Sequence, residues 1–295
     1  MKRMSKFFKK IVSGQNPTDE DWARHLIESH KIAPGMTPRA FASHQTHEGI
    51  NSYELLARSV DLMNERNVTL IDLACGNGYL IQYLLPKLGN KAHILGIDIS
   101  NVELEAAKAT YKDPRVIFHC SKAQSLPIEN NSVDLILCHM AFMLMVPIEP
   151  VISEISRVLK SQGRFSAIIR GPDMHGLFGD IQQLVFQFID TRYPKVREVK
   201  SGDQRVFSQE GLKQLFKPKL GFKKIEEHFK FELQINTTPE DVWDSLMKDM
   251  YFTGMLPEKE KNQLKEKLVS FLKNKTNSSE KISFGFPMQK FTISK

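Results

Sequence analysis

Short apolar segments alternate along the chain with longer segments in which apolar residues recur at helical spacing. Between residues 68 and 170, the segments rich in β-branched and other apolar residues predict five strands: Val68–Leu73, Ala92–Ile97, Arg115–Phe118, Val133–Cys138 and Arg164–Ile169. Segments suited to helices separate several of them: Tyr79–Leu88, Asn101–Tyr111 and Glu149–Lys160. Strands that alternate with helices in this way indicate a parallel sheet covered on both faces.

The alternation stops after residue 170. The pattern there predicts four helices and two late strands: helices Asp173–Tyr193, Ser208–Lys217, Pro239–Tyr251 and Pro257–Lys273, and strands Phe222–Leu233 and Lys281–Ser294. Ahead of the first strand we expect a helix that begins near Thr18 and Asp21 and ends at Pro34-Gly35, and a second helix over Ser52–Arg66. Ser100 and Glu103 have the spacing of a capping box.

Composition and charge narrow the class of protein. Five basic residues and no acid lie within residues 1–10, and without them 36 basic residues stand against 34 acidic ones. The net charge of +7 is therefore weak support for a nucleic-acid partner. The apolar stretch Met140–Val146 is too short to span a bilayer, and no signal peptide is recognisable, so we expect a cytoplasmic protein. Its three scattered cysteines predict neither disulfides nor a zinc site.

The strongest chemical signal is the segment from Leu70 to Tyr79, which reads LIDLACGNGY. An apolar strand with an acid, Asp72, leads into a glycine-rich turn at the edge where open α/β sheets bind ligands. The second predicted strand is followed by Asp98, a carboxylate that can accept hydrogen bonds from ribose hydroxyls. Nicotinamide enzymes use the same device, but the chain lacks their G-x-G-x-x-G turn.

These motifs resemble those of class I S-adenosylmethionine-dependent methyltransferases, especially those that act on small molecules. The likeness covers about residues 68–170 through four further segments: Asp98, Ala123–Pro127 (AQSLP), Asn131–Leu137 (NSVDLIL) and Arg157–Phe165 (RVLKSQGRF). A weaker likeness continues to the C-terminus. The resemblance implies a doubly wound, Rossmann-like sheet of seven strands with the last one inserted antiparallel. The predicted N-terminal helices and the insertion after residue 170 are outside the cofactor motifs, and in this fold we expect them to cap the site at the carboxyl ends of the strands.

The resemblance assigns S-adenosylmethionine to the ends of the first two strands. The implied cofactor-binding residues are Asp72, Ala74, Cys75, Gly76, Asn77, Gly78, Asp98, Ile99, Ala123, Gln124 and Cys138. The family has an acid that accepts from the adenine amino group where this chain has Lys122. Lysine cannot accept that bond, so adenine recognition must use the Ala123 backbone, Gln124 or another group.

The acceptor side is less defined. His139 is positioned to act as a general base, although a purely structural histidine is the alternative. Met143 belongs to a soft apolar cluster that either packs in the core or lines an acceptor pocket. His44 and His47 suit a substrate pocket better than a metal, and no metal site is predicted. Phe178 lies on the apolar face of a predicted helix, which forms either a lid over the pocket or a fixed cover on the core.

We therefore expect three segments: a basic helical cap at 1–50, a cofactor-binding core at 51–170, and an insertion or lid with the completing strands at 171–295. The expected activity is methyl transfer from S-adenosylmethionine to a small molecule, including aromatic or lipid-soluble rings. An RNA or protein methyltransferase is one alternative, since basic clusters remain at 192–200 and 213–224. A cofactor-binding scaffold without activity is another, and Lys122 is the argument for it.

Overall fold

The computed structural model describes residues 5–63, 67–173, 175–276 and 280–295. It divides into two compact units, which are described separately. The sheet unit comprises residues 48–172, 201–231 and 288–295, and the helical unit comprises residues 1–47, 173–200 and 232–287. The first four residues and the predicted helix end at 64–66 lie outside the described residues.

The sheet has seven strands in the order β3-β2-β1-β4-β5-β7-β6, as the resemblance predicts. Neighbours β1 to β5 pair in parallel, and β7 pairs antiparallel with β5. The bounds are β1 Thr69–Leu73, β2 His93–Asp98, β3 Val116–Cys120, β4 Val133–His139, β5 Leu159–Arg170, β6 Lys224–Thr237 and β7 Ile282–Ser294. The carboxyl ends of β1, β2 and β4 therefore meet at one edge of the sheet.

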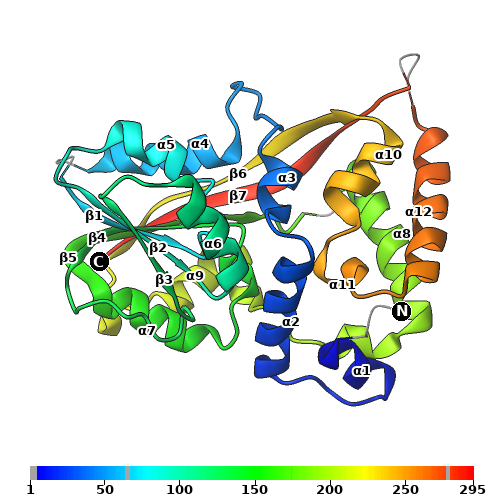
Figure 1. Cartoon of the computed structure of the whole chain (residues 1–295), viewed down its shortest axis with the longest axis horizontal. Coiled ribbons are helices and arrows are strands. Elements are labelled where there is room, and N and C mark those ends of the chain that lie inside the picture. The colour runs from blue at the N-terminus through cyan, green and yellow to red at the C-terminus, as the bar shows by residue number, and fades with distance from the viewer. Residues whose placement is uncertain (1–4, 64–66, 174, 277–279) are drawn as a thin grey trace. The chain divides into compact units, whose positions relative to one another are not determined.

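Helices cover both faces of this sheet: α4 and α5 lie on one face, and α7 and α9 on the other (Figure 1). The elements are α4 Ser52–Ala57, η1 Arg58–Leu62, α5 Ile81–Leu84, η2 Leu85–Lys87, α6 Asn101–Thr110, η3 Phe142–Leu144, α7 Ile148–Val158, η5 Gln204–Phe207, α9 Gln209–Leu215 and η6 Pro218–Leu220. Apolar side chains such as Ile136, Phe165 and Phe291 pack with Ile152 and Phe216 in the buried core. This rigid layer holds the strand ends in place.

Two capping predictions have different outcomes. At Thr18 the capping box forms, with Thr18 Oγ1 accepting from the Asp21 amide and the Asp21 carboxylate accepting from the Thr18 amide. The predicted box at Ser100 is wrong, because the Ser100 side chain makes no capping bond. The Ser100 amide instead donates to Asp98 Oδ1 at 2.8 Å. The Asp98 carboxylate at the end of β2 therefore accepts from the backbone amide just before α6, in place of the predicted capping box.

The helical unit contains α1 Lys6–Val12, α2 Asp19–Ile32, α3 Met36–Phe41, α8 Gly176–Arg192, η4 Pro194–Glu198, α10 Pro239–Asp241, the π-helix η7 Val242–Met247, α11 Tyr251–Gly254 and α12 Glu258–Lys273. The single helix predicted over Pro239–Tyr251 is therefore three short pieces. Aromatic rings form much of the interior, where Phe7, Trp22 and Tyr251 pack around His25. No helix among the described residues is long and apolar enough to cross a membrane.

Candidate active site

The turn after β1 has a strained backbone. Ala74 adopts a φ of +59°, and Gly76 and Gly78 also have positive φ angles. Glycine tolerates this left-handed region and alanine does not, so Ala74 costs about 1–2 kcal/mol. A Cβ at Gly78 would approach the Tyr111 ring to 2.9 Å. Strain of this kind persists only where surrounding contacts enforce it, and it gathers at functional sites.

Asp98, at the end of β2, holds the same turn. Its Oδ2 accepts from the Gly76 amide at 2.8 Å, and its Oδ1 accepts from the Ser100 amide at 2.8 Å. A carboxylate offers about four lone-pair sites, so the two amide donors do not by themselves use all of its accepting capacity. Asp98 can therefore brace the glycine turn and accept ribose hydroxyls at the same time.

Asp72 lies within β1 and is almost fully buried. Its Oδ2 has no hydrogen-bond partner among the described residues. Burial, and then the nearby Asp98 charge, raise the pKa of this carboxyl to about 8. A buried acceptor without a donor is costly, and a bound cation would stabilise its charged form. The ammonium and sulfonium groups of S-adenosylmethionine are cations, so the residues at this edge fit that cofactor.

His139 lies at the end of β4 and is buried against α4. Its Nε2 is 2.9 Å from Ser52 Oγ, and its ring stacks on Tyr53 with centroids 3.7 Å apart. Its Nδ1 has no partner among the described residues. Burial lowers the pKa of His139 to about 3, so the ring is neutral near pH 7. The next residue, Met140, has a φ of +54°, so backbone strain marks the ends of both β1 and β4.

Sequence reasoning did not connect Tyr53 and Ser52 with this site. Tyr53 is buried, and its pKa is raised by burial first and then by the charge of Asp72. Its ring also meets Tyr79, just after the glycine turn, with centroids 4.8 Å apart. The sequence predicted a helix that begins at Ser52. The start of that helix does not indicate that its side chains pack on the end of β4.

Near the ends of β4 and β5, three further segments of the sheet unit are in contact: η3, the chain at Gly202, and η5. The backbone of Met143 in η3 contacts Gly202 so closely that a side chain there has no room. At the end of β5, the Arg170 guanidinium lies 5.1 Å from the centre of the Phe207 ring in η5. Burial lowers the pKa of Arg170. Arg170 and Phe207 are further candidates for the acceptor side that sequence reasoning missed.

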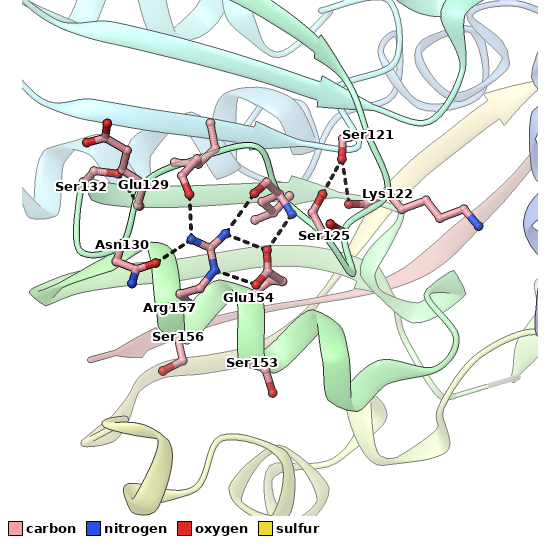
Figure 2. Close-up of polar contacts among 12 residues, drawn as sticks. Ser121, Lys122, Ser125, Glu129, Asn130, Ser132, Ser153, Glu154, Ser156 and Arg157 are labelled. Carbon is pink, nitrogen blue, oxygen red and sulfur yellow. Dashed lines mark hydrogen bonds and ion pairs between the residues drawn. The ribbon is translucent and has the colours of Figure 1, made fainter.

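The loop between β3 and β4 contains the predicted adenine-binding residues. Ala123 is buried. The Gln124 Nε2 donates to the Val146 carbonyl at 3.1 Å, which leaves its Oε1 as the accepting group. Figure 2 shows Arg157 directed into the later part of this loop, while the Lys122 side chain extends away from Arg157.

The other predicted cofactor residues also belong to the sheet unit. Cys75 and Asn77 lie in the glycine turn, and Ile99 follows β2. Cys138 is buried in β4, and burial raises the pKa of its thiol above the usual range. The amides of Cys75 and Gly78 already donate within the fold, to the carbonyls of Ile97 and Cys75.

Three predicted pocket residues belong to the helical unit. Phe178 packs against the Phe286 ring with centroids 4.5 Å apart and is 2% exposed. The Gln234 amide lies 3.1 Å from His47 Nε2, and burial lowers the pKa of His44.

Comparison with known proteins identifies the core of the sheet unit. Residues 71–167 match the family model described as a methyltransferase domain. A malonyl-[acyl-carrier protein] O-methyltransferase of Bacillus anthracis is 25% identical over 55% of this chain and 57% of its own length. A ubiquinone/menaquinone biosynthesis C-methyltransferase of Campylobacter jejuni is 32% identical over 36% of this chain and 46% of its own length.

The chain thus spans about half the length of these curated relatives. Among solved structures, the [4+2]-cyclase SpnF has the same fold, with a TM-score of 0.56 and 16% identity over 95% of this chain and 97% of its own. The fold, the matched family model and the polar edge of the sheet agree. Residues 71–167 of the chain form a class I S-adenosylmethionine-dependent methyltransferase domain, a family whose methyl donor is S-adenosylmethionine.

Proposed function

We propose that this protein transfers a methyl group from S-adenosylmethionine to a small-molecule acceptor. The observation that carries the proposal is the pair of carboxylates at the ends of β1 and β2, inside the matched domain. Asp98 accepts from the Gly76 amide of the glycine turn through Oδ2 and from the Ser100 amide through Oδ1, and Asp72 keeps a buried oxygen without a partner among the described residues. A cationic cofactor bound at this edge would favour the ionised form of Asp72 beside the Asp98 charge.

The proposed cofactor contacts follow the sheet edge. Asp98 would accept from the ribose hydroxyls, and the turn at 74–78 with Asp72 would hold the amino-acid end. Ile99 would flank the adenine, and Ala123 and Gln124 would recognise its edge. When bound, S-adenosylmethionine supplies a methyl group already activated on a sulfonium, so the protein contributes orientation and a dry site.

His139 is the residue that we propose lies next to the acceptor, where the methyl group is transferred. Its neutral ring can accept a proton from an acceptor hydroxyl or amine, but a pKa of about 3 makes it a weak base. Its bond to Ser52 and its stack on Tyr53 fix the ring plane. We therefore propose that His139 orients the acceptor. A pH–rate profile with an acidic limb that His139→Ala removes would assign it general-base catalysis as well.

A small, apolar or ring-containing acceptor suits the residues that follow β4. Ala141, Met143, Met145 and Phe207 are partly buried hydrophobic residues that pack against the core of the sheet unit. The two relatives above are named for a carrier-bound malonyl group and for quinones. The proposal assigns cofactor binding to 51–170, which also contributes His139 and Met143 on the acceptor side, and it assigns a further influence on acceptor choice to 1–50 and 171–295, where His44, His47 and Phe178 lie.

Transfer of a tritiated methyl group to a cell extract tests this proposal. After separation into small-molecule, RNA and protein fractions, we expect the label in the small-molecule fraction and none with the Asp98→Ala variant. Label in RNA, or label that stays in protein after carrier-bound acyl groups have been cleaved off, would contradict the choice of acceptor. Because one fold supports many chemistries, cofactor binding without transfer to any fraction would instead favour the inactive scaffold.

A further inference from the structure

One polar cluster of the sheet unit has no place in the site described above. Glu154 and Arg157 lie on the same side of α7, three residues apart, and form an ion pair through both carboxylate oxygens. Arg157 Nε is 2.7 Å from Glu154 Oε1, and Nη2 is 2.8 Å from Oε2. This two-point geometry fixes the plane of the guanidinium group.

The pair holds both backbone polar groups of Leu126. The Leu126 amide donates to Glu154 Oε2 at 2.6 Å, and its carbonyl accepts from Arg157 Nη2 at 2.9 Å. Arg157 Nη1 also donates to the Ile128 carbonyl and to Asn130 Oδ1, each at 2.7 Å. Figure 2 shows these bonds converging on one guanidinium from successive points of the loop.

Leu126 directly follows the turn at 121–125, which has internal bonds of its own. Ser121 Oγ donates to the Ser125 carbonyl at 2.5 Å, and the Ser125 amide donates to the Lys122 carbonyl at 3.0 Å. The turn is therefore a preformed unit, joined to β3 at one end and to Leu126 at the other. Moving Leu126 would displace the whole unit, including the backbone of Ala123.

Lys122 makes the position of that backbone important. Where an acidic side chain accepts from the adenine amino group, a flexible side chain can compensate for small backbone shifts. In this chain Lys122 cannot accept from the base, and the groups of this loop that can are backbone carbonyls and Gln124, whose Nε2 is already engaged with Val146. Recognition by backbone groups depends on where the loop itself lies.

We propose that Glu154 and Arg157 are positioning residues that set the adenine-binding turn at 121–125 and thereby the selectivity for the base. The inference rests on the proposed binding of S-adenosylmethionine at this edge. Neither residue contacts the cofactor; both act through Leu126. Selectivity is the diagnostic property, because loss of general stability lowers affinity for all nucleosides alike.

Calorimetric binding of S-adenosylhomocysteine and of S-inosylhomocysteine tests the proposal. The inosyl compound replaces the adenine amino donor with an oxo acceptor and places a proton on N1. The wild-type protein should prefer the adenosyl compound. Arg157→Lys keeps the charge but not the planar fork, and should weaken adenosyl binding about tenfold, as for the loss of one hydrogen bond between the base and a neutral backbone group. The preference over the inosyl compound should fall toward unity, and Glu154→Gln should act in the same direction.

Arg164→Lys is the matched control. Arg164 and Glu226 form an ion pair at 2.6 Å, with side chains 25% and 18% exposed, against 32% and 17% for Arg157 and Glu154. This control should alter thermal stability to a similar extent and leave the selectivity unchanged.

Three results would overturn parts of the account separately. An unchanged selectivity in folded Arg157→Lys and Glu154→Gln variants would refute the positioning role. Equal wild-type affinity for the two compounds would refute it as well, since no base selectivity would exist to be set. Wild-type protein that binds neither compound would refute the proposed function itself.

Discussion

The sheet unit and the helical unit use buried residues differently. At the carboxyl edge of the sheet, Ala74 and Met140 have strained backbones, and Asp72 buries an oxygen that has no partner among the described residues. In the helical unit, Phe178 and Trp22 pack in aromatic clusters that bury apolar surface. Backbone strain and the buried Asp72 oxygen lower stability at the edge of the sheet, where we expect a ligand. The aromatic clusters of the helical unit raise stability instead.

Two buried histidines make the comparison sharper. His25 in the helical unit has its Nε2 2.9 Å from the Tyr251 carbonyl and stacks on Phe7. His139 in the sheet unit has a similar bond and a similar stack, and burial lowers the pKa of both. Burial and pairing therefore do not distinguish a site histidine from a structural one. The position in the fold does distinguish the two histidines, because His139 ends a strand of the matched domain, 71–167, and His25 does not.

Replacing Phe178 with alanine should give the largest change in stability. It removes a fully packed ring, and the cavity should lower the free energy of unfolding by about 3–5 kcal/mol. Phe186→Ala on the same helix is the control, because that ring is 40% exposed and should matter by less than about 1 kcal/mol. Urea denaturation measures both. If both replacements lowered the free energy of unfolding equally, the buried and exposed rings of α8 would contribute equally to stability, contrary to this account.

Asp72→Asn should stabilise the protein at alkaline pH while weakening cofactor binding. Between the ordinary pKa of 3.8 and about 8, the folded protein keeps a proton that the unfolded chain has released. The free energy of unfolding of the wild type therefore falls as pH rises through this window, by about 1 kcal/mol per unit. Asparagine does not titrate, so the fall should be absent. Asp134→Asn, which breaks an exposed pair with Lys160, should retain it.

His139 should produce the opposite pH dependence. Its pKa is 6.5 when unperturbed and about 3 in the fold, so the unfolded chain binds a proton first as pH falls. Stability should decrease by about 1 kcal/mol per unit from pH 6.5 downward. His139→Gln should reduce this slope, and His25→Gln should reduce it in the same direction. A slope that neither replacement changes would contradict the burial of both rings.

Ala74→Gly should give the smallest change. Relief of the positive φ outweighs the added flexibility of the unfolded chain, so the free energy of unfolding should rise by about 0.5–1 kcal/mol. Ala106→Gly, in the exposed part of α6, should lower it by about 1 kcal/mol instead. A loss of stability at position 74 would show that the turn does not hold the left-handed backbone.

The sequence predicted the sheet well because strand periodicity and strand-end motifs are local signals. β1, β2 and β4 begin or end within a residue of the predicted segments. The Ser100 capping box failed because Asp98, two residues earlier, competes for the same amide. The surroundings of His139 could not be predicted, since Ser52 is 87 positions away in the chain. Contacts of that kind depend on how α4 packs, which no local pattern encodes.

Calorimetric titration of wild-type and Asp98→Ala protein with S-adenosylhomocysteine and with NAD tests the central claim most directly. The account predicts saturable binding of S-adenosylhomocysteine to the wild type and none of NAD. Affinity should fall about 100-fold or more in Asp98→Ala, through loss of two charge-assisted hydrogen bonds. Asp113→Ala, which removes the ion pair with Arg115, should bind like the wild type. Undiminished binding to folded Asp98→Ala, or binding of NAD alone, would contradict the account.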